Sequence, residues 1–221
     1  MGIPVIVIGE SGSGKTYSIK NMNPDKVGIF LCEKNRLPFR KQFKTYKVKN
    51  MVDQENRTIR QGAVIYTLLK HPRNVELKRY VIDDSQYIMA NEFFDRANEK
   101  GYDKFTDIGS TFRNLVHLVN NELPDDVIVY FLHHPELDTN TGKQKAKTIG
   151  RMLDEKLTLE GCFDIVLFAR TNGAEHWFDT QSNGMDTAKS PEDMFDARIP
   201  TDLALVDAKI REYYGLEVIT V

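Results

Sequence analysis

The chain has 221 residues, of which 41% are hydrophobic and 28% are charged, and its formal net charge is −2. This length supports one good hydrophobic core and is short for two, so we expect a single domain over residues 1–221. The charge excludes a globally basic nucleic-acid-binding protein, and any contact with DNA or RNA must come from local basic patches.

The cysteines and the apolar runs indicate in which cellular compartment the protein is found. Cys32 and Cys162 lie far apart, each beside an apolar run, which favours buried thiols over a disulfide or a metal pair. The chain shows no signal-peptide pattern, no myristoylation pattern and no apolar run of about 20 residues. We therefore expect a soluble, cytoplasmic protein without a membrane partner.

The first sixteen residues carry the clearest motif. An apolar run, Ile3–Ile8, leads into residues 9–16, GESGSGKT, which fit the P-loop pattern G-x-x-x-x-G-K-[ST] better than a chance glycine-rich turn. In such a loop the backbone curls so that its N–H groups point inward, and together with the N-terminus of the following helix they bind an anion. We expect Lys15 to reach the β- and γ-phosphates and Thr16 to ligate Mg²⁺. The motif predicts ATP or ADP binding, with Mg²⁺, by Gly9, Ser11, Gly12, Ser13, Gly14, Lys15 and Thr16.

Residues 17–22 are predicted to continue as a helix, and a second apolar strand at 27–32 ends on Glu33. Parallel sheets place ligands at the carboxyl ends of their strands, so Glu33 is a candidate general base. A solvated strand end is an equal alternative on position alone.

The stretch 34–49 holds many cations and no acidic residue, with Phe39, Phe43 and Tyr46 interleaved. Cations and aromatics together could hold single-stranded nucleic acid. We slightly favour a second interpretation, in which the aromatic side chains face the core and the lysines lie in solvent. A helix is predicted over 59–70.

The run Tyr80–Ile82 ends in Asp83 and Asp84, the Walker B pattern. Behind a P-loop, an aspartate at a strand end orients Mg²⁺ and its waters, and we assign this role to Asp83. Asp84 could polarise water, but capping the helix that begins near Ser85 is the use we favour.

Helices are predicted over 85–100 and 107–121, followed by a fourth strand, 127–132, that ends on His133 and His134. A polar residue at this strand end can sense the γ-phosphate. Adjacent strand residues point in opposite directions, so at most one histidine does so. A zinc site would need further ligands at metal spacing.

Residues 139–153 form a second basic stretch without acids, at the same edge of the sheet. Binding of a ligand here is favoured over a solvated loop. In an extended segment Lys143, Lys145 and Lys147 point to one side, about 7 Å apart, near the phosphate spacing of a stretched single strand. A helix over 151–159, a fifth strand over 163–169, a hairpin near 175–184, a helix over 202–214 and an edge strand over 216–221 complete the chain.

The segments GESGSGKT, FLCEKN, YVIDD, YFLHHPE, GKQKAKTIG and DTAKSPEDMF resemble the small RecA-like ATPases of bacteriophages, including the RecA-related branch of the Sak single-strand annealing proteins. The resemblance covers nearly the whole chain. It implies an α/β, RecA-like P-loop NTPase fold: a mainly parallel five-stranded core sheet in the order 5-1-4-3-2, flanked by helices, with a C-terminal hairpin extension.

The resemblance also implies roles for particular residues. Lys15, Thr16 and Asp83 carry over by motif, Glu33 becomes the catalytic base and His134 the sensor. Lys143, Lys145 and Lys147 fall where RecA-like proteins bind single-stranded DNA. Arg170 or Lys189 could reach the γ-phosphate of a neighbouring subunit in a homo-oligomer. The resemblance does not extend to the extra terminal domains of RecA.

The leading functional hypothesis is an ATPase that acts on single-stranded DNA in phage recombination or replication, in the host cytoplasm, with a phage recombination or single-strand-binding protein as a possible partner. One alternative is a nucleotide-dependent switch that binds a protein. Another is a nucleotide kinase, although kinases need an arginine-rich lid and the corresponding segment here is rich in lysine.

Overall fold

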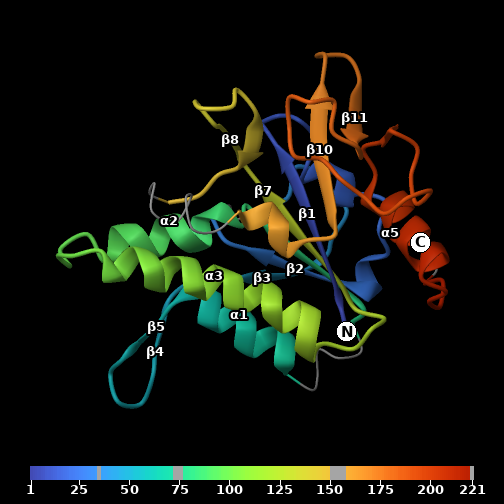
Figure 1. The fold of residues 1–221 in the computed structure, drawn as a ribbon. Helices are drawn as coiled ribbons and strands as arrows, with labels where there is room; N and C mark the ends of the chain where they lie inside the picture. Colours follow the sequence, from blue (N-terminus) through green and yellow to red (C-terminus); the bar gives the residue numbers. More distant parts are fainter. Residues whose placement is uncertain (34–35, 72–76, 150–157, 220–221) are drawn as a thin grey trace.

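The computed structural model describes residues 1–33, 36–71, 77–149 and 158–219. Their central feature is an eight-stranded sheet in the order β12-β11-β10-β1-β7-β6-β2-β3 (Figure 1). The strands from β10 to β3 pair in parallel, whereas β11 and β12 pair antiparallel beside β10. The fold is therefore mixed α/β with a large, mostly parallel sheet.

Five buried strands form the middle of the sheet. They are β1 (Ile3–Gly9), β2 (Val27–Leu31), β6 (Arg79–Asp83), β7 (Ile128–His133) and β10 (Ile165–Thr171). Each is a nearly continuous apolar run because both faces of a parallel sheet are covered. The strand β7 lies between β1 and β6, so the P-loop and Asp83 leave the same edge on strands that flank β7.

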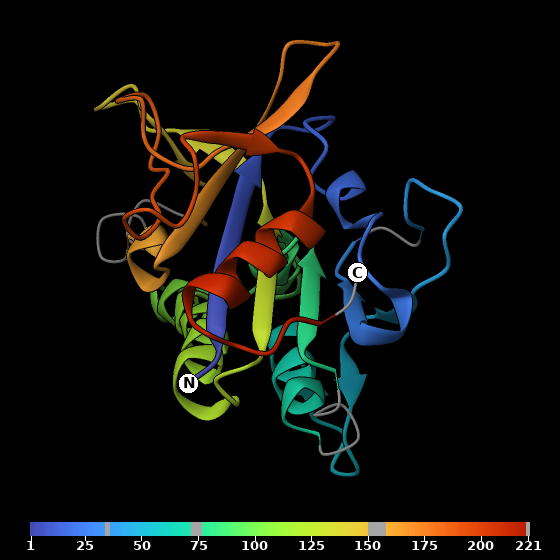
Figure 2. The same cartoon turned by 90° about the vertical axis from the view of Figure 1, so that its right-hand side faces the viewer.

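Helices cover both faces of the sheet. On one face lie α1 (Gln61–Lys70), α2 (Gln86–Asp95) and α3 (Asp103–Glu122), and α5 (Leu203–Tyr213) lies across the other (Figures 1 and 2). A hydrophobic core lies on each face of the sheet, and alternate residues of β1 point into one or the other. Ile6 and Ile8 pack with the three helices, and Val5 and Val7 pack toward α5.

Shorter elements surround this frame. They are the strands β3 (Lys44–Lys47), β4 (Met51–Val52), β5 (Thr58–Ile59), β8 (Pro135–Leu137), β9 (Gln144–Ala146), β11 (His176–Asp179) and β12 (Arg198–Pro200), and the 3-10 turns η1 (Tyr17–Ile19), η2 (Pro24–Lys26) and η4 (Leu159–Cys162). The strands β10 and β11 form a hairpin that turns between residues 171 and 176, so the hairpin predicted near 175–184, with its turn at 182–184, is misplaced. Most of the helix predicted over 151–159 lies outside the described residues.

Two further predictions about secondary structure are wrong. The helix expected after the P-loop is only the turn η1, because Asn23 and Pro24 begin a separate turn a few residues later. The strand expected over 216–221 does not form at residues 216–219. The carbonyls of Glu217 and Ile219 accept hydrogen bonds from Arg211 and Arg79 instead of joining a ladder.

Within the described ranges, no helix combines the length and the apolar composition that crossing a membrane requires.

The boundaries of two helices differ from the predicted ones: the helix predicted over 85–100 ends at Asp95, and the helix predicted over 107–121 begins at Asp103.

Candidate functional site

The P-loop curls through two glycines with left-handed backbone angles. Gly12 has φ +81° and Gly14 has φ +94°, which side chains rarely allow. Gly9 is needed for space, because a Cβ atom there would lie 2.6 Å from the Ser13 hydroxyl oxygen. In the part of the chain that the structure describes, the N–H groups of Gly12 and Gly14 have no hydrogen-bond acceptor. Such donors fit an anion such as phosphate.

The Lys15 side chain folds back over its own loop. Its ammonium group donates to the carbonyl oxygens of Gly9 and Glu10, at 2.5 and 2.9 Å, and the residue is only 6% exposed. It also lines the cavity beside the loop. To bind a phosphate, the ammonium would exchange these carbonyl oxygens for phosphate oxygens.

Thr16 and Asp83 meet across the strand edge. The Thr16 hydroxyl donates to a carboxylate oxygen of Asp83 at 2.8 Å, and Asp83 is 1% exposed. A hydroxyl and a carboxylate are hard oxygen ligands of the kind that Mg²⁺ prefers. The residues present therefore fit Mg²⁺, which Thr16 and Asp83 would hold.

Acidic residues gather around the ends of β2 and β6. Glu33 is exposed and follows the end of β2 by two residues, and Leu31 pairs with Asp83. Burial raises the pKa of the Cys32 thiol, and the charges of Asp83, Asp84 and Glu33 raise it further. The structure thus brings Glu33 to the edge that carries Asp83.

The two adjacent histidines face different surroundings. His134 lines a cavity of about 500 Å³ together with Lys15 and Thr16, and its Nε2 lies 3.4 Å from a carboxylate oxygen of Asp84. Asp84 has φ +58°, a left-handed angle that is uncommon outside glycine. The Asp84 side chain, favoured as a helix cap from sequence, lies beside His134.

His133 is fully buried. Its Nε2 lies 2.8 Å from the carbonyl oxygen of Lys147, which can only accept, so Nε2 donates and Nδ1 accepts from the Ser85 hydroxyl at 2.8 Å. Burial lowers the pKa of His133 to about 4. This neutral imidazole ties the start of α2 to the second basic stretch.

Within the described part of that stretch, residues 139–149, β9 pairs with β8 in a β-hairpin, and residues 150–153 lie outside the described residues. Lys143 and Lys147 are exposed and Ala146 is buried, as expected for alternation along β9. Lys145 is partly exposed and lies 4.0 Å from Glu136 of β8. The three lysines are thus accessible to different degrees.

The cations considered for a neighbouring subunit differ in their surroundings. The Arg170 guanidinium is held by Asp179, Asp186 and Gln144 of its own chain. The backbone of Lys189 bridges to Val166, and the residue is exposed.

In the first basic stretch the aromatic residues pack inward. Phe39 and Phe43 lie against the core on the α5 side, and Tyr46 packs against the core under α1 to α3. This placement agrees with the interpretation in which these aromatic side chains pack against the core.

Four residues that line the cavity beside the P-loop were not predicted from the sequence: Tyr17, Pro38, His176 and Thr201. Tyr17 directly follows the motif and could have been found from it. The other three come from distant segments, which only the fold brings together.

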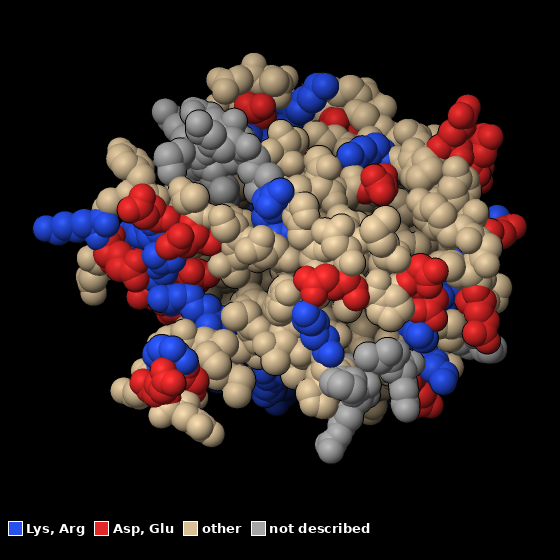
Figure 3. Space-filling view, turned by 60° about the horizontal axis from the view of Figure 1, so that its bottom comes forward, with Lys and Arg blue, Asp and Glu red and all other residues tan. Residues whose placement is uncertain are grey.

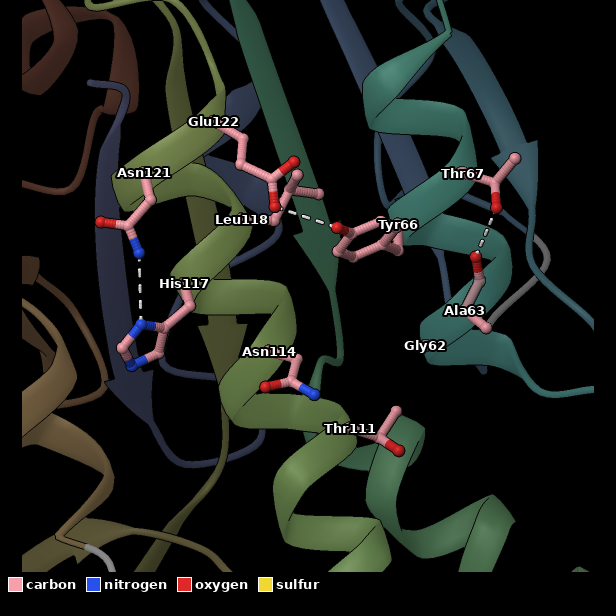
Figure 4. Close-up of a pocket in the computed structure, with 10 residues that line it drawn as sticks. All are labelled: Gly62, Ala63, Tyr66, Thr67, Thr111, Asn114, His117, Leu118, Asn121 and Glu122. Atoms are coloured by element: carbon pink, nitrogen blue, oxygen red, sulfur yellow. Dashed lines mark hydrogen bonds between the residues drawn. The ribbon is translucent and has the colours of Figure 1, made fainter.

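A second groove lies between α1 and α3, about 490 Å³ in volume and lined mainly by uncharged polar side chains. Figure 4 shows Tyr66 and Glu122 pointing toward each other, joined by a hydrogen bond of 3.0 Å. Acidic and basic side chains intermingle on the face shown in Figure 3. None of the predicted site residues lines this groove.

In the comparison with known protein families, a family model described as an AAA domain matches residues 1–201. The matched range holds the P-loop, Asp83, the β8–β9 hairpin and β11. No curated protein matches the chain.

Proposed function

The chain belongs to the AAA domain family, and we propose that it is a Mg²⁺-dependent ATPase of the RecA-like type that acts on single-stranded DNA in phage recombination or replication. Family membership supports nucleotide binding and ATP hydrolysis. The DNA substrate, the phage setting and the RecA-like assignment rest on the sequence resemblance and on the geometry described above.

One observation carries the enzymatic proposal: the 2.8 Å hydrogen bond between Thr16 and Asp83. It joins the last residue of the P-loop motif to the strand-end aspartate, across 67 positions of sequence. In P-loop ATPases these two groups hold the metal that accompanies the nucleotide. The order β10-β1-β7-β6-β2, with β7 between the two motif strands, supports the RecA-like assignment.

The proposed division of roles follows from position. Lys15 and the N–H groups of the loop bind the phosphates, and Thr16 and Asp83 hold Mg²⁺. When bound, Mg²⁺ offsets the negative charge of the phosphate oxygens. Glu33 accepts a proton from the attacking water, and His134 donates to the terminal phosphate.

The β8–β9 hairpin is the proposed DNA contact. It begins immediately after His134, so a change at the nucleotide has a short covalent path to Lys143, Lys145 and Lys147. Arg170 is already held by acidic residues of its own chain, so Lys189 is the better candidate to reach a neighbour in a homo-oligomer.

Steady-state hydrolysis of ATP with Mg²⁺ tests the proposal, measured alone, with single-stranded DNA and with nucleoside acceptors. We expect hydrolysis that DNA stimulates, and Glu33→Gln should keep ATP affinity while slowing turnover. Phosphate transfer to an acceptor would replace the proposal with a kinase. Binding without hydrolysis would replace it with a nucleotide switch.

A further inference from the structure

His176 lies against the P-loop although it comes from β11, far away in the sequence. Its Nδ1 is 3.2 Å from the carbonyl oxygen of Ser13. A Cβ atom placed on Gly14 would lie 3.2 Å from the same Nδ1 and 3.2 Å from a methyl carbon of Thr201. The imidazole therefore packs directly on the peptide that joins Ser13 to Gly14.

The hydrogen bond fixes the direction of this peptide. The Ser13 carbonyl can only accept, so Nδ1 of His176 donates to it. In a trans peptide the carbonyl and the next N–H point in opposite directions. Holding the Ser13 carbonyl toward His176 therefore directs the Gly14 N–H away from it. In the described ranges that N–H has no hydrogen-bond acceptor.

The next peptide is held in a different way. The Gly14 carbonyl accepts from the Ser18 N–H at 2.9 Å, within the short turn that follows the loop. Because this turn, η1, is only three residues long, it fixes few of the loop peptides. The Ser13–Gly14 peptide thus depends on a contact from outside the loop.

We propose that His176 is a positioning residue of the nucleotide site: through Nδ1 it holds the Ser13–Gly14 peptide so that the Gly14 N–H is presented to a phosphate group of the nucleotide. This inference rests on the proposed nucleotide binding at the same P-loop. It makes the β10–β11 hairpin part of the site, although no P-loop motif includes that hairpin.

Two amide substitutions separate the ring nitrogens. In His176→Asn the amide nitrogen replaces Nδ1, and in His176→Gln it replaces Nε2. The dissociation constants of ADP and ATP would be measured with Mg²⁺ for the parent, both variants and His176→Ala. His117→Ala is the control, because His117 is a histidine of α3 that lines the groove of Figure 4.

We expect His176→Ala and His176→Gln to weaken ADP and ATP binding by about tenfold, the upper range for one hydrogen bond. His176→Asn should remain within about twofold of the parent, and so should His117→Ala. His176 is exposed, so thermal unfolding should be unchanged in all variants. A purely structural role would not give this rescue by asparagine.

The outcomes are distinguishable. If the parent binds nucleotide and all His176 variants bind equally well, the inference is wrong and the proposed function stands. If asparagine and glutamine weaken binding equally, positioning through Nδ1 is wrong. If the parent binds no nucleotide, the proposed function fails, and this inference fails with it.

Discussion

Two buried aspartates at opposite ends of the sheet show how differently this fold uses a carboxylate. Asp83, at the carboxyl end of β6, accepts the Thr16 hydroxyl and is 1% exposed. Asp207, on α5, is fully buried and accepts from the guanidinium groups of Arg79 and Arg211. The Tyr130 hydroxyl also donates to it at 3.1 Å.

The partners of the two aspartates indicate which end of the sheet can bind a ligand. At Asp207 the charge is matched by two arginines, whose remaining N–H groups bind carbonyl oxygens, including those of Lys78 and Ile219. This network ties the C-terminal segment and α5 to the sheet. At Asp83 a neutral hydroxyl from the P-loop donates to the carboxylate, and these two oxygen groups are of the kind that Mg²⁺ prefers.

The largest expected effect is on stability. Asp207→Ala leaves two guanidinium groups buried without their carboxylate, which costs about 3–5 kcal/mol of unfolding free energy. Urea denaturation measures this loss. Asp126→Ala is the control, because the Lys78–Asp126 pair is partly exposed and should contribute less than about 1 kcal/mol. A loss below about 1 kcal/mol for Asp207→Ala would refute the structural role.

The next effect concerns pH at the carboxyl end of β7, the edge of the sheet that also carries Asp83. The pKa of His133 is about 4 in the folded protein and about 6.5 in the unfolded chain, so the unfolded state binds more protons between these values. Stability is full above about pH 6.5 and falls by about 2–3 kcal/mol as the pH drops toward 4.5.

His133→Gln should remove this part of the pH dependence while lowering stability at neutral pH. Unfolding free energies at pH 7 and pH 4.5 measure it. His117→Gln, on α3, serves as the control for loss of a histidine elsewhere. Equal pH dependence in the parent and in His133→Gln would contradict the buried neutral imidazole.

A smaller effect is expected at the metal site. Asp83→Asn retains the shape of the side chain and removes its charge, so the fold should persist while Mg²⁺-dependent ATP binding weakens by about tenfold. Titration with Mg²⁺ at fixed ATP measures this. The assignment of Asp83 fails if the variant and the parent show the same metal dependence.

The smallest effect is the salt dependence of DNA binding. Replacing Lys143, Lys145 and Lys147 by glutamine should flatten the plot of log affinity against log salt by about two units, near −0.7 for each phosphate contact. Binding of a labelled single-stranded oligonucleotide, with ADP and with a non-hydrolysable ATP analogue, measures the slope. An identical slope in parent and variant would remove the DNA role from this hairpin.

The motif-bearing end was predictable because local sequence determines it. An apolar strand followed by the P-loop, and a strand that ends on Asp83, predict that Thr16 and Asp83 lie at the carboxyl edge of one parallel sheet. The five central strands were predictable for the same reason, because each is a continuous apolar run.

The remainder depends on long-range contacts that leave no local pattern. His176 and Thr201 reach the P-loop only through the antiparallel extension of the sheet. The segment 216–219 has a strand-like composition, yet its carbonyl oxygens are drawn to two buried arginines. The helix expected after the P-loop is shortened to the turn η1.

Hydrolysis of ATP by Lys15→Ala tests most directly whether the P-loop is the active site of an ATPase. Phosphate release with Mg²⁺ would be compared among the parent, Lys15→Ala and Lys26→Ala, whose lysine is exposed on η2. We expect hydrolysis by the parent and by Lys26→Ala, and a loss of about 100-fold or more in Lys15→Ala with the fold retained. Hydrolysis by Lys15→Ala at the parental rate would show that the P-loop is not the active site.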